Sequence, residues 1–173
     1  MRLIALAAVT AMVATAAVAQ TPPSAEIKNN AGAAVGSATF REGPKGVLVQ
    51  VKVSGLTPGW HGIHFHAVGD CSDTAKFQKS GAHINHAGDH KMPHGLLNPA
   101  GSDFGELPNI FAGADGVAEA QLWTSLVSWS GKDGRPGLAD ADGSALVIHA
   151  NQDDHLSQPI GGAGDRVACA VIK

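Results

Sequence analysis

The chain has 173 residues, a formal net charge of −3, and 22 glycines, 9 prolines and 9 histidines. This length suits a single domain, and a slightly acidic chain without a basic run argues against a nucleic-acid-binding protein. Abundant glycine and proline favour many turns, and the histidines outnumber what a folded core needs.

The N-terminal segment is predicted to be a targeting signal. Arg2 precedes a nearly unbroken apolar run at 3–18, and small residues at 17–19 match a signal-peptidase site. We therefore expect a signal peptide at 1–19, a flexible leader at 20–24 and one domain at 25–173, in a protein that is periplasmic or secreted. A transmembrane anchor is the alternative, but the run is short for a span, and no later segment suits a membrane.

Short strands separated by turns are predicted along the rest of the chain. Valines at 47, 49, 51 and 53 repeat with a period of two, which buries one face of a strand. The expected strands are 25–29, 35–40, 47–53, 61–66, 109–112, 117–124, 145–150 and 167–172. No segment has a convincing helical period. We expect an all-β fold, a single-domain Greek-key β-sandwich or flattened barrel of about eight antiparallel strands with long metal-binding loops.

Three segments are too long for simple turns, at 69–108, 125–143 and 151–165. Long loops in a compact domain are usually functional. The sequence assigns no role to the Ser125–Gly143 loop.

Histidines supply the main chemical signal. His64 and His66 lie two residues apart in an expected strand, so both side chains project from one face. His149 ends another expected strand, and His83 comes from the first long loop. Any one histidine alone is more often an ordinary surface or core residue. Four imidazoles without a thiolate suit copper, so together they predict a copper site.

Two longer motifs carry a family resemblance. The run at 62–70, GIHFHAVGD, and the run at 161–172, GGAGDRVACAVI, resemble the two signatures of the Cu,Zn superoxide dismutases. Cys71 and the phrase GLLNP at 95–99 are similar to bacterial exported members. The resemblance implies an oxidoreductase that converts superoxide to oxygen and hydrogen peroxide. It implies a histidine-bound copper that is alternately reduced and oxidised, zinc as a second cofactor, and superoxide as the partner molecule.

The same resemblance implies roles for individual residues. The implied copper ligands are His64, His66, His83 and His149. His83 would also bridge to zinc and, with Arg166 as the anion-orienting cation, would be catalytic. Asp153 would link copper and zinc ligands from outside the metal sites, and His61 would pack and hydrogen-bond without binding metal.

The two cysteines, Cys71 and Cys169, predict one disulfide in an exported chain, with two free thiols as the alternative. The resemblance implies that this disulfide ties the first long loop to the last strand.

The zinc site departs from the family pattern. The spacing of His94, Asp103 and Glu106 agrees with the family's zinc ligands, yet the family usually has His and Asp at the last two positions. Three outcomes are open. In the first, zinc is bound by His83, His94, Asp103 and Glu106, since carboxylates are acceptable ligands. In the second, another loop residue replaces one of these four, and in the third the enzyme holds copper alone. The candidate replacements are His86 and His90, which share the loop with Asp89.

The sequence also fits a second function besides that of an enzyme. The histidine-dense loop at 83–94 also suits a periplasmic copper-binding or buffering protein without efficient turnover. Arg166 and Asp153 favour the enzyme, because storage needs neither an anion guide nor a link between sites. A monomer and a homodimer both remain open, as do the source of the superoxide and the partner that delivers copper.

Overall fold

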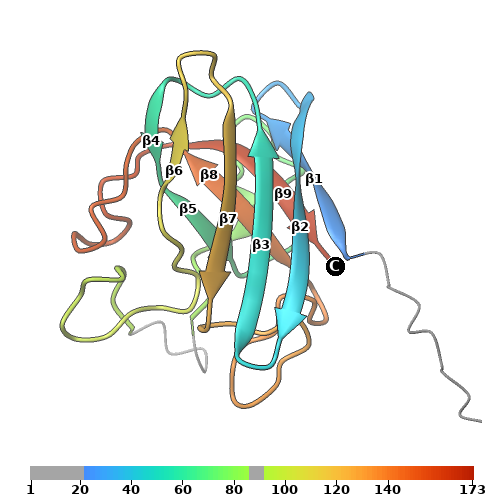
Figure 1. Ribbon diagram of the computed structural model, residues 1–173, viewed down its shortest axis with the longest axis vertical. Helices are drawn as coiled ribbons and strands as arrows, with labels where there is room; N and C mark the ends of the chain where they lie inside the picture. Colours follow the sequence, from blue (N-terminus) through green and yellow to red (C-terminus); the bar gives the residue numbers. More distant parts are fainter. Residues whose placement is uncertain (1–21, 86–91) are drawn as a thin grey trace, which may run out of the picture.

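The computed structural model describes residues 22–85 and 92–173 (Figure 1). The predicted signal peptide, the first residues of the leader, and His86, Asp89 and His90 therefore lie outside the described residues. No helix in the described ranges is long and apolar enough to span a membrane.

The described chain forms nine strands in two sheets. In chain order they are β1 (Ser24–Asn29), β2 (Ala34–Gly43), β3 (Gly46–Val53), β4 (Gly59–His61), β5 (Ile63–His66), β6 (Ile110–Ala112), β7 (Ala118–Thr124), β8 (Ser144–His149) and β9 (Arg166–Ile172). Seven form one antiparallel sheet in the order β5-β8-β9-β1-β2-β3-β7, and β4 pairs with β6. A short 3-10 turn, η1 (Gln78–Ser80), lies in the first long loop.

The large sheet curls into two layers. Figure 1 shows β2, β3 and β7 in front of β5, β8 and β9. The rings of Phe40 on β2 and Phe65 on β5 lie 6.4 Å apart, although three other strands lie between β2 and β5 in the sheet. Both phenylalanines are fully buried, so the core fills the space between the layers. The expected all-β sandwich is confirmed.

The valine pattern of β3 behaves as predicted. Val47, Val49, Val51 and Val53 are each at most 2% exposed, and they anchor the front layer to the core. β2 extends to Gly43, beyond the predicted end at 40, because it pairs with β3 from Gly36 to Gly43.

The expected single strand at 61–66 is two strands in different sheets. The change occurs at Gly62, whose N–H donates to Asn151 O and whose carbonyl accepts from His149 N. These bonds turn the chain from β6, the partner of β4, to β8, the partner of β5. A Cβ at Gly62 would lie 3.0 Å from Ala163 Cβ, so this crossing has little room for a side chain.

The Ser125–Gly143 loop covers one end of the core. Val127 and Leu138 are fully buried in the core cluster. The ring of Trp129 packs 5.7 Å from that of Phe40. The loop for which the sequence predicted no role thus closes the space between the two layers.

Candidate metal centre

Four buried histidines from two adjacent strands and the first long loop converge on one point. β5 carries His64 and His66, and its antiparallel partner β8 ends at His149. His83 forms an isolated bridge with His66. One ring nitrogen of each of the four lies within 4.8 Å of the others. The four positions named from the sequence are therefore neighbours in the fold.

One nitrogen of each ring is held by a protein oxygen. The pairs are His64 Nε2 with Asp153 Oδ2 at 2.8 Å, His66 Nδ1 with Gly81 O at 2.9 Å, His83 Nδ1 with Asp103 Oδ2 at 3.1 Å, and His149 Nδ1 with Gly164 O at 3.0 Å. A carbonyl or carboxylate oxygen outside the clusters can only accept, so His64 Nε2, His66 Nδ1 and His149 Nδ1 carry the proton. The tautomer of these three imidazoles, and the orientation of their rings, follow from these contacts. His83 differs, because the carboxylate that faces its Nδ1 belongs to the second cluster described below.

The opposite nitrogens are buried and have no hydrogen-bond partner among the described residues. They are His64 Nδ1, His66 Nε2, His83 Nε2 and His149 Nε2. A buried polar atom without a partner is costly, and a shared metal ion would satisfy all four at once. Desolvation lowers the pKa of His64 to about 4 and that of His149 to about 3, so both rings are neutral near pH 7. Neutral imidazoles are the form that binds metal, and this donor set fits copper.

A second cluster shares His83 with the first. His83, His94, Asp103 and Glu106 each offer a ligand atom, again within 4.8 Å of one another, and all four are buried. His94 Nδ1 and Glu106 Oε1 face one another, and neither atom has a hydrogen-bond partner among the described residues. Nitrogen and carboxylate oxygen fit zinc.

Glycine at position 105 permits this approach. A Cβ there would lie 2.3 Å from Phe65 O and 3.1 Å from His83 Cβ. A larger residue would push the Asp103–Glu106 segment away from His83. Asp103 and Glu106 thus lie beside His83 and His94, whereas the alternative ligands His86 and His90 lie outside the described residues.

Asp153 joins the two clusters. Its fully buried carboxylate accepts from His64 Nε2 at 2.8 Å and from His94 Nε2 at 3.0 Å. Burial opposes the charge, but these hydrogen bonds outweigh it and hold the pKa of Asp153 well below its usual value. Gly161 leaves the space for this arrangement, because a Cβ there would lie 1.6 Å from Asp153 Oδ1.

Two residues around Asp153 were missed from the sequence. Asn109 accepts from Asp153 N at 2.9 Å and donates to Asp153 O at 2.7 Å, so it fixes the backbone of the carboxylate. His155 donates its backbone N–H to Asp153 Oδ1 at 2.7 Å. The Nε2 atom of its ring lies 3.1 Å from Asn109 Nδ2, within hydrogen-bond distance. The position of His155 two residues after Asp153 was a usable signal, whereas nothing near Asn109 indicated its role.

His61 lies outside both clusters. Its two ring nitrogens each lie 2.7 Å from a backbone carbonyl, those of Thr57 and His149. The ring connects the segment before β4 to the end of β8 and has no nitrogen left for a metal. This geometry agrees with the packing role expected for it.

Arg166 is a cation that lies next to the first cluster. It begins β9 opposite His149 of β8. Its Nη1 donates to Phe77 O at 2.7 Å and to Ser80 Oγ at 3.0 Å. Arg166, His149 and Lys76 are among the residues that line a cavity of about 720 Å³. Anions that enter this cavity meet the positive charge of Arg166 beside His149.

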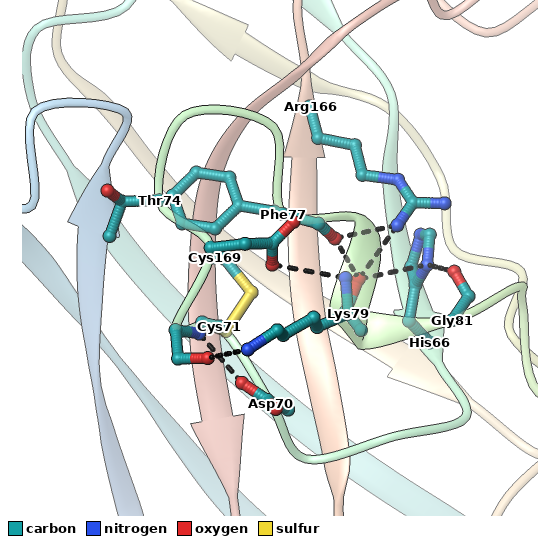
Figure 2. The surroundings of a disulfide bond; sticks show 12 residues. His66, Asp70, Cys71, Thr74, Phe77, Lys79, Gly81, Arg166 and Cys169 are labelled. Carbon is teal, nitrogen blue, oxygen red and sulfur yellow. Dashed lines mark hydrogen bonds between the residues drawn. A yellow bond between two sulfur atoms is a disulfide. The ribbon is translucent and has the colours of Figure 1, made fainter.

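The predicted disulfide is confirmed. Cys71 and Cys169 are bonded with a Cα–Cα distance of 5.9 Å (Figure 2), which ties the first long loop to β9. Both cysteines join Phe77, Ala145 and Val147 in a small buried cluster of their own. The loop segment that holds Arg166 is therefore anchored by a covalent bond and by apolar packing.

Comparison with known proteins identifies the family. The family model described as copper/zinc superoxide dismutase matches residues 34–172. The chain belongs to the copper/zinc superoxide dismutase family. It is 55% identical, over 87% of its length and 84% of the relative's, to the Cu-Zn superoxide dismutase of Caulobacter vibrioides. A relative from Aquifex aeolicus, named Cu-Zn superoxide dismutase 1, is 37% identical over 86% of each chain.

Solved structures agree with this family. A SOD-like protein from Bacillus subtilis has a TM-score of 0.79 at 30% identity and covers 87% of this chain and 97% of its own. The Cu/Zn superoxide dismutase from Brucella abortus has a TM-score of 0.68 at 26% identity, over 88% and 100%. The cofactors of a copper/zinc superoxide dismutase fit the two clusters, one of four imidazoles and one of mixed nitrogen and carboxylate donors.

Proposed function

We propose that this protein is a superoxide dismutase that converts two superoxide ions and two protons into dioxygen and hydrogen peroxide. The observation that most supports the proposal is the set of four buried ring nitrogens that point inward without partners. Beside them lies a cavity lined by Arg166, through which a small anion can approach.

In this proposal copper is held by the four unpartnered nitrogens of His64, His66, His83 and His149. Zinc is held by His83, His94, Asp103 and Glu106, the mixed cluster that shares one imidazole with the first. Copper, when bound, supplies one-electron oxidation and reduction.

The residues of the chain perform the remaining tasks. Arg166 binds the anion electrostatically and orients it with a planar guanidinium. Asp153 keeps the protons of His64 and His94 on their Nε2 atoms, which leaves both Nδ1 atoms free for metal. His83 Nε2 is the buried nitrogen that can hold a proton and donate it to the reduced substrate.

A copper-buffering protein is the alternative function. A measurement of superoxide consumption by the copper- and zinc-loaded protein, with the metal-free protein as control, separates the two. A dismutase loses copper and activity together on His64→Ala, since that change removes one of four ligands. Stoichiometric copper binding with no more activity than the metal-free control would refute the enzyme.

Export is a further part of the proposal. We propose that the segment 1–19 is removed as a signal peptide and that the protein acts in the periplasm or outside the cell. The Cys71–Cys169 disulfide supports this, since such bonds persist in oxidising compartments. Sequencing the N-terminus of the exported protein tests it, with Gln20 as the expected first residue.

We propose a homodimer through the small sheet of β4 and β6. Trp60 and Phe111 lie on these strands, are 51% and 54% exposed, and stack edge to face at 5.1 Å. Large exposed aromatic side chains are typical of interface cores. Sedimentation of the parent protein and of Trp60→Ser tests this proposal, which a monomeric parent would refute.

A further inference from the structure

Neutral groups hold the guanidinium of Arg166. Figure 2 shows its Nη1 between the first long loop and the copper-cluster histidine His66. Nη1 donates to the carbonyl of Phe77 at 2.7 Å and to the hydroxyl of Ser80 at 3.0 Å. No ion pair joins Arg166 to a carboxylate among the described residues, so its charge is not neutralised by direct contact.

The rest of the guanidinium is available to a ligand. Within the described ranges, all of its hydrogen bonds come from Nη1, which leaves Nε and Nη2 without a protein acceptor. Arg166 lines the cavity of about 720 Å³ together with the cluster histidine His149. Two adjacent N–H groups on a planar fork suit an anion bound in this cavity.

Ser80 defines which way the fork is held. The residue is fully buried, and its Oγ donates its one proton to Phe77 O at 2.7 Å. The lone pairs of that oxygen therefore face Arg166, and the hydroxyl acts as an acceptor toward Nη1. With Phe77 O alone, the guanidinium would pivot about a single hydrogen bond. With both oxygens, the plane of the fork is defined.

The turn that carries these two oxygens is rigid. Phe77 has a left-handed backbone, with φ of 51°, and its ring is fully buried in the cluster around the disulfide. The Asp73 carboxylate accepts from Gln78 N at 2.7 Å and from Lys79 N at 3.1 Å, which closes the turn from the other side. The carbonyl of Gly81, the residue after Ser80, accepts a hydrogen bond from His66 Nδ1. One short segment therefore orients both a cluster histidine and Arg166.

We propose that Ser80 is a positioning residue for anion binding, and that its hydroxyl orients the Arg166 guanidinium toward the substrate cavity. This inference rests on the proposed function for its physiological meaning. The affinity of the copper-loaded protein for an inert anion can test it independently of turnover.

The experiment measures the dissociation constant of azide by optical titration of the copper- and zinc-loaded protein. Ser80→Ala should weaken azide binding about tenfold and lower kcat/KM for superoxide by a similar factor, because a hydrogen bond to a charged group is lost. Copper content should not change, since Ser80 Oγ lies 3.5 Å from His66 Nδ1 while Gly81 O holds that nitrogen at 2.9 Å. Ser80→Thr, which retains the hydroxyl, should recover most of the azide affinity.

Two further variants make the test specific. Ser72→Ala is the matched control, because this exposed serine of the same loop bonds Lys79 Nζ and does not contact Arg166. It should bind azide like the parent protein. In the Arg166→Ala background, Ser80→Ala should cause no further loss, because the hydroxyl acts through the arginine.

Parental azide affinity in Ser80→Ala, or an additive loss in the double variant, would overturn the inference. A parent protein that binds azide in a Ser80-dependent way but does not consume superoxide would refute the proposed function and leave this inference standing.

Discussion

Asp153→Asn tests how the two clusters depend on one another. The substitution keeps the shape of the side chain but replaces one acceptor oxygen by an NH2 group. In the parent protein the carboxylate accepts hydrogen bonds from His64 Nε2 and His94 Nε2, at 2.8 and 3.0 Å. An amide can accept from only one of them, so the other imidazole must move its proton to the nitrogen that faces the metal cluster. One cluster therefore loses a ligand.

The weaker site should lose its metal first. The general affinity order places Cu²⁺ above Zn²⁺, so we expect the cost to fall on zinc. Loss of such an outer hydrogen bond typically lowers metal affinity by about 10- to 100-fold, or roughly 1.4–2.7 kcal/mol. Competition against a zinc-binding dye, with copper measured in parallel against a copper chelator, gives both affinities.

Asp154→Asn is the matched control for this measurement. This neighbouring aspartate is exposed, and its carboxylate accepts from the backbone of Leu156 and Ser157 without touching an imidazole. It should bind both metals like the parent protein. Zinc and copper affinities in Asp153→Asn equal to those of Asp154→Asn would show that the carboxylate does not set the tautomers, and the reasoning would fail.

Three other changes probe separate parts of the structure. Arg166→Ala should keep its copper but slow superoxide consumption at least tenfold at low salt and weaken the salt dependence, since a cation is lost from the cavity; an unchanged rate at low salt would contradict this role. Asp103→Ala should reduce zinc content more than copper content, as measured by elemental analysis, and the idea fails if the parent protein binds no zinc. The double change Cys71→Ser with Cys169→Ser removes the disulfide, which joins residues 98 positions apart and so restricts the unfolded chain. It should lower the free energy of unfolding by about 4–5 kcal/mol in urea denaturation of the metal-free protein. An unchanged unfolding midpoint would argue against that constraint.

Features that depend on short stretches of chain were predictable. The valines of β3 alternate, and a strand turns every second side chain to the same face, so the core face could be named before the fold was known. The same geometry placed His64 and His66 side by side. The predicted strands match the observed ones within a few residues, except where a strand changes sheet at Gly62.

The resemblance to a family added what periodicity does not contain. It connected His83, Asp153 and Arg166, which lie in separate segments, to one site, and the structure brings them to the same region. It also marked Asp103 and Glu106 as a departure from the usual ligands. Their closeness to His94 could not be deduced from the sequence, because it depends on the path of the chain between β5 and β6.

The amino-acid sequence alone determined the all-β class, the buried faces of the strands and the presence of histidine side chains that suit copper. These follow from a period of two and from side-chain chemistry, which are local properties. The tertiary structure decided which nitrogen of each imidazole is free, how Asn109 supports Asp153, and how Ser80 holds Arg166. Each of these is a contact between residues far apart in the chain or within an irregular loop, and no sequence period encodes the directions of such hydrogen bonds.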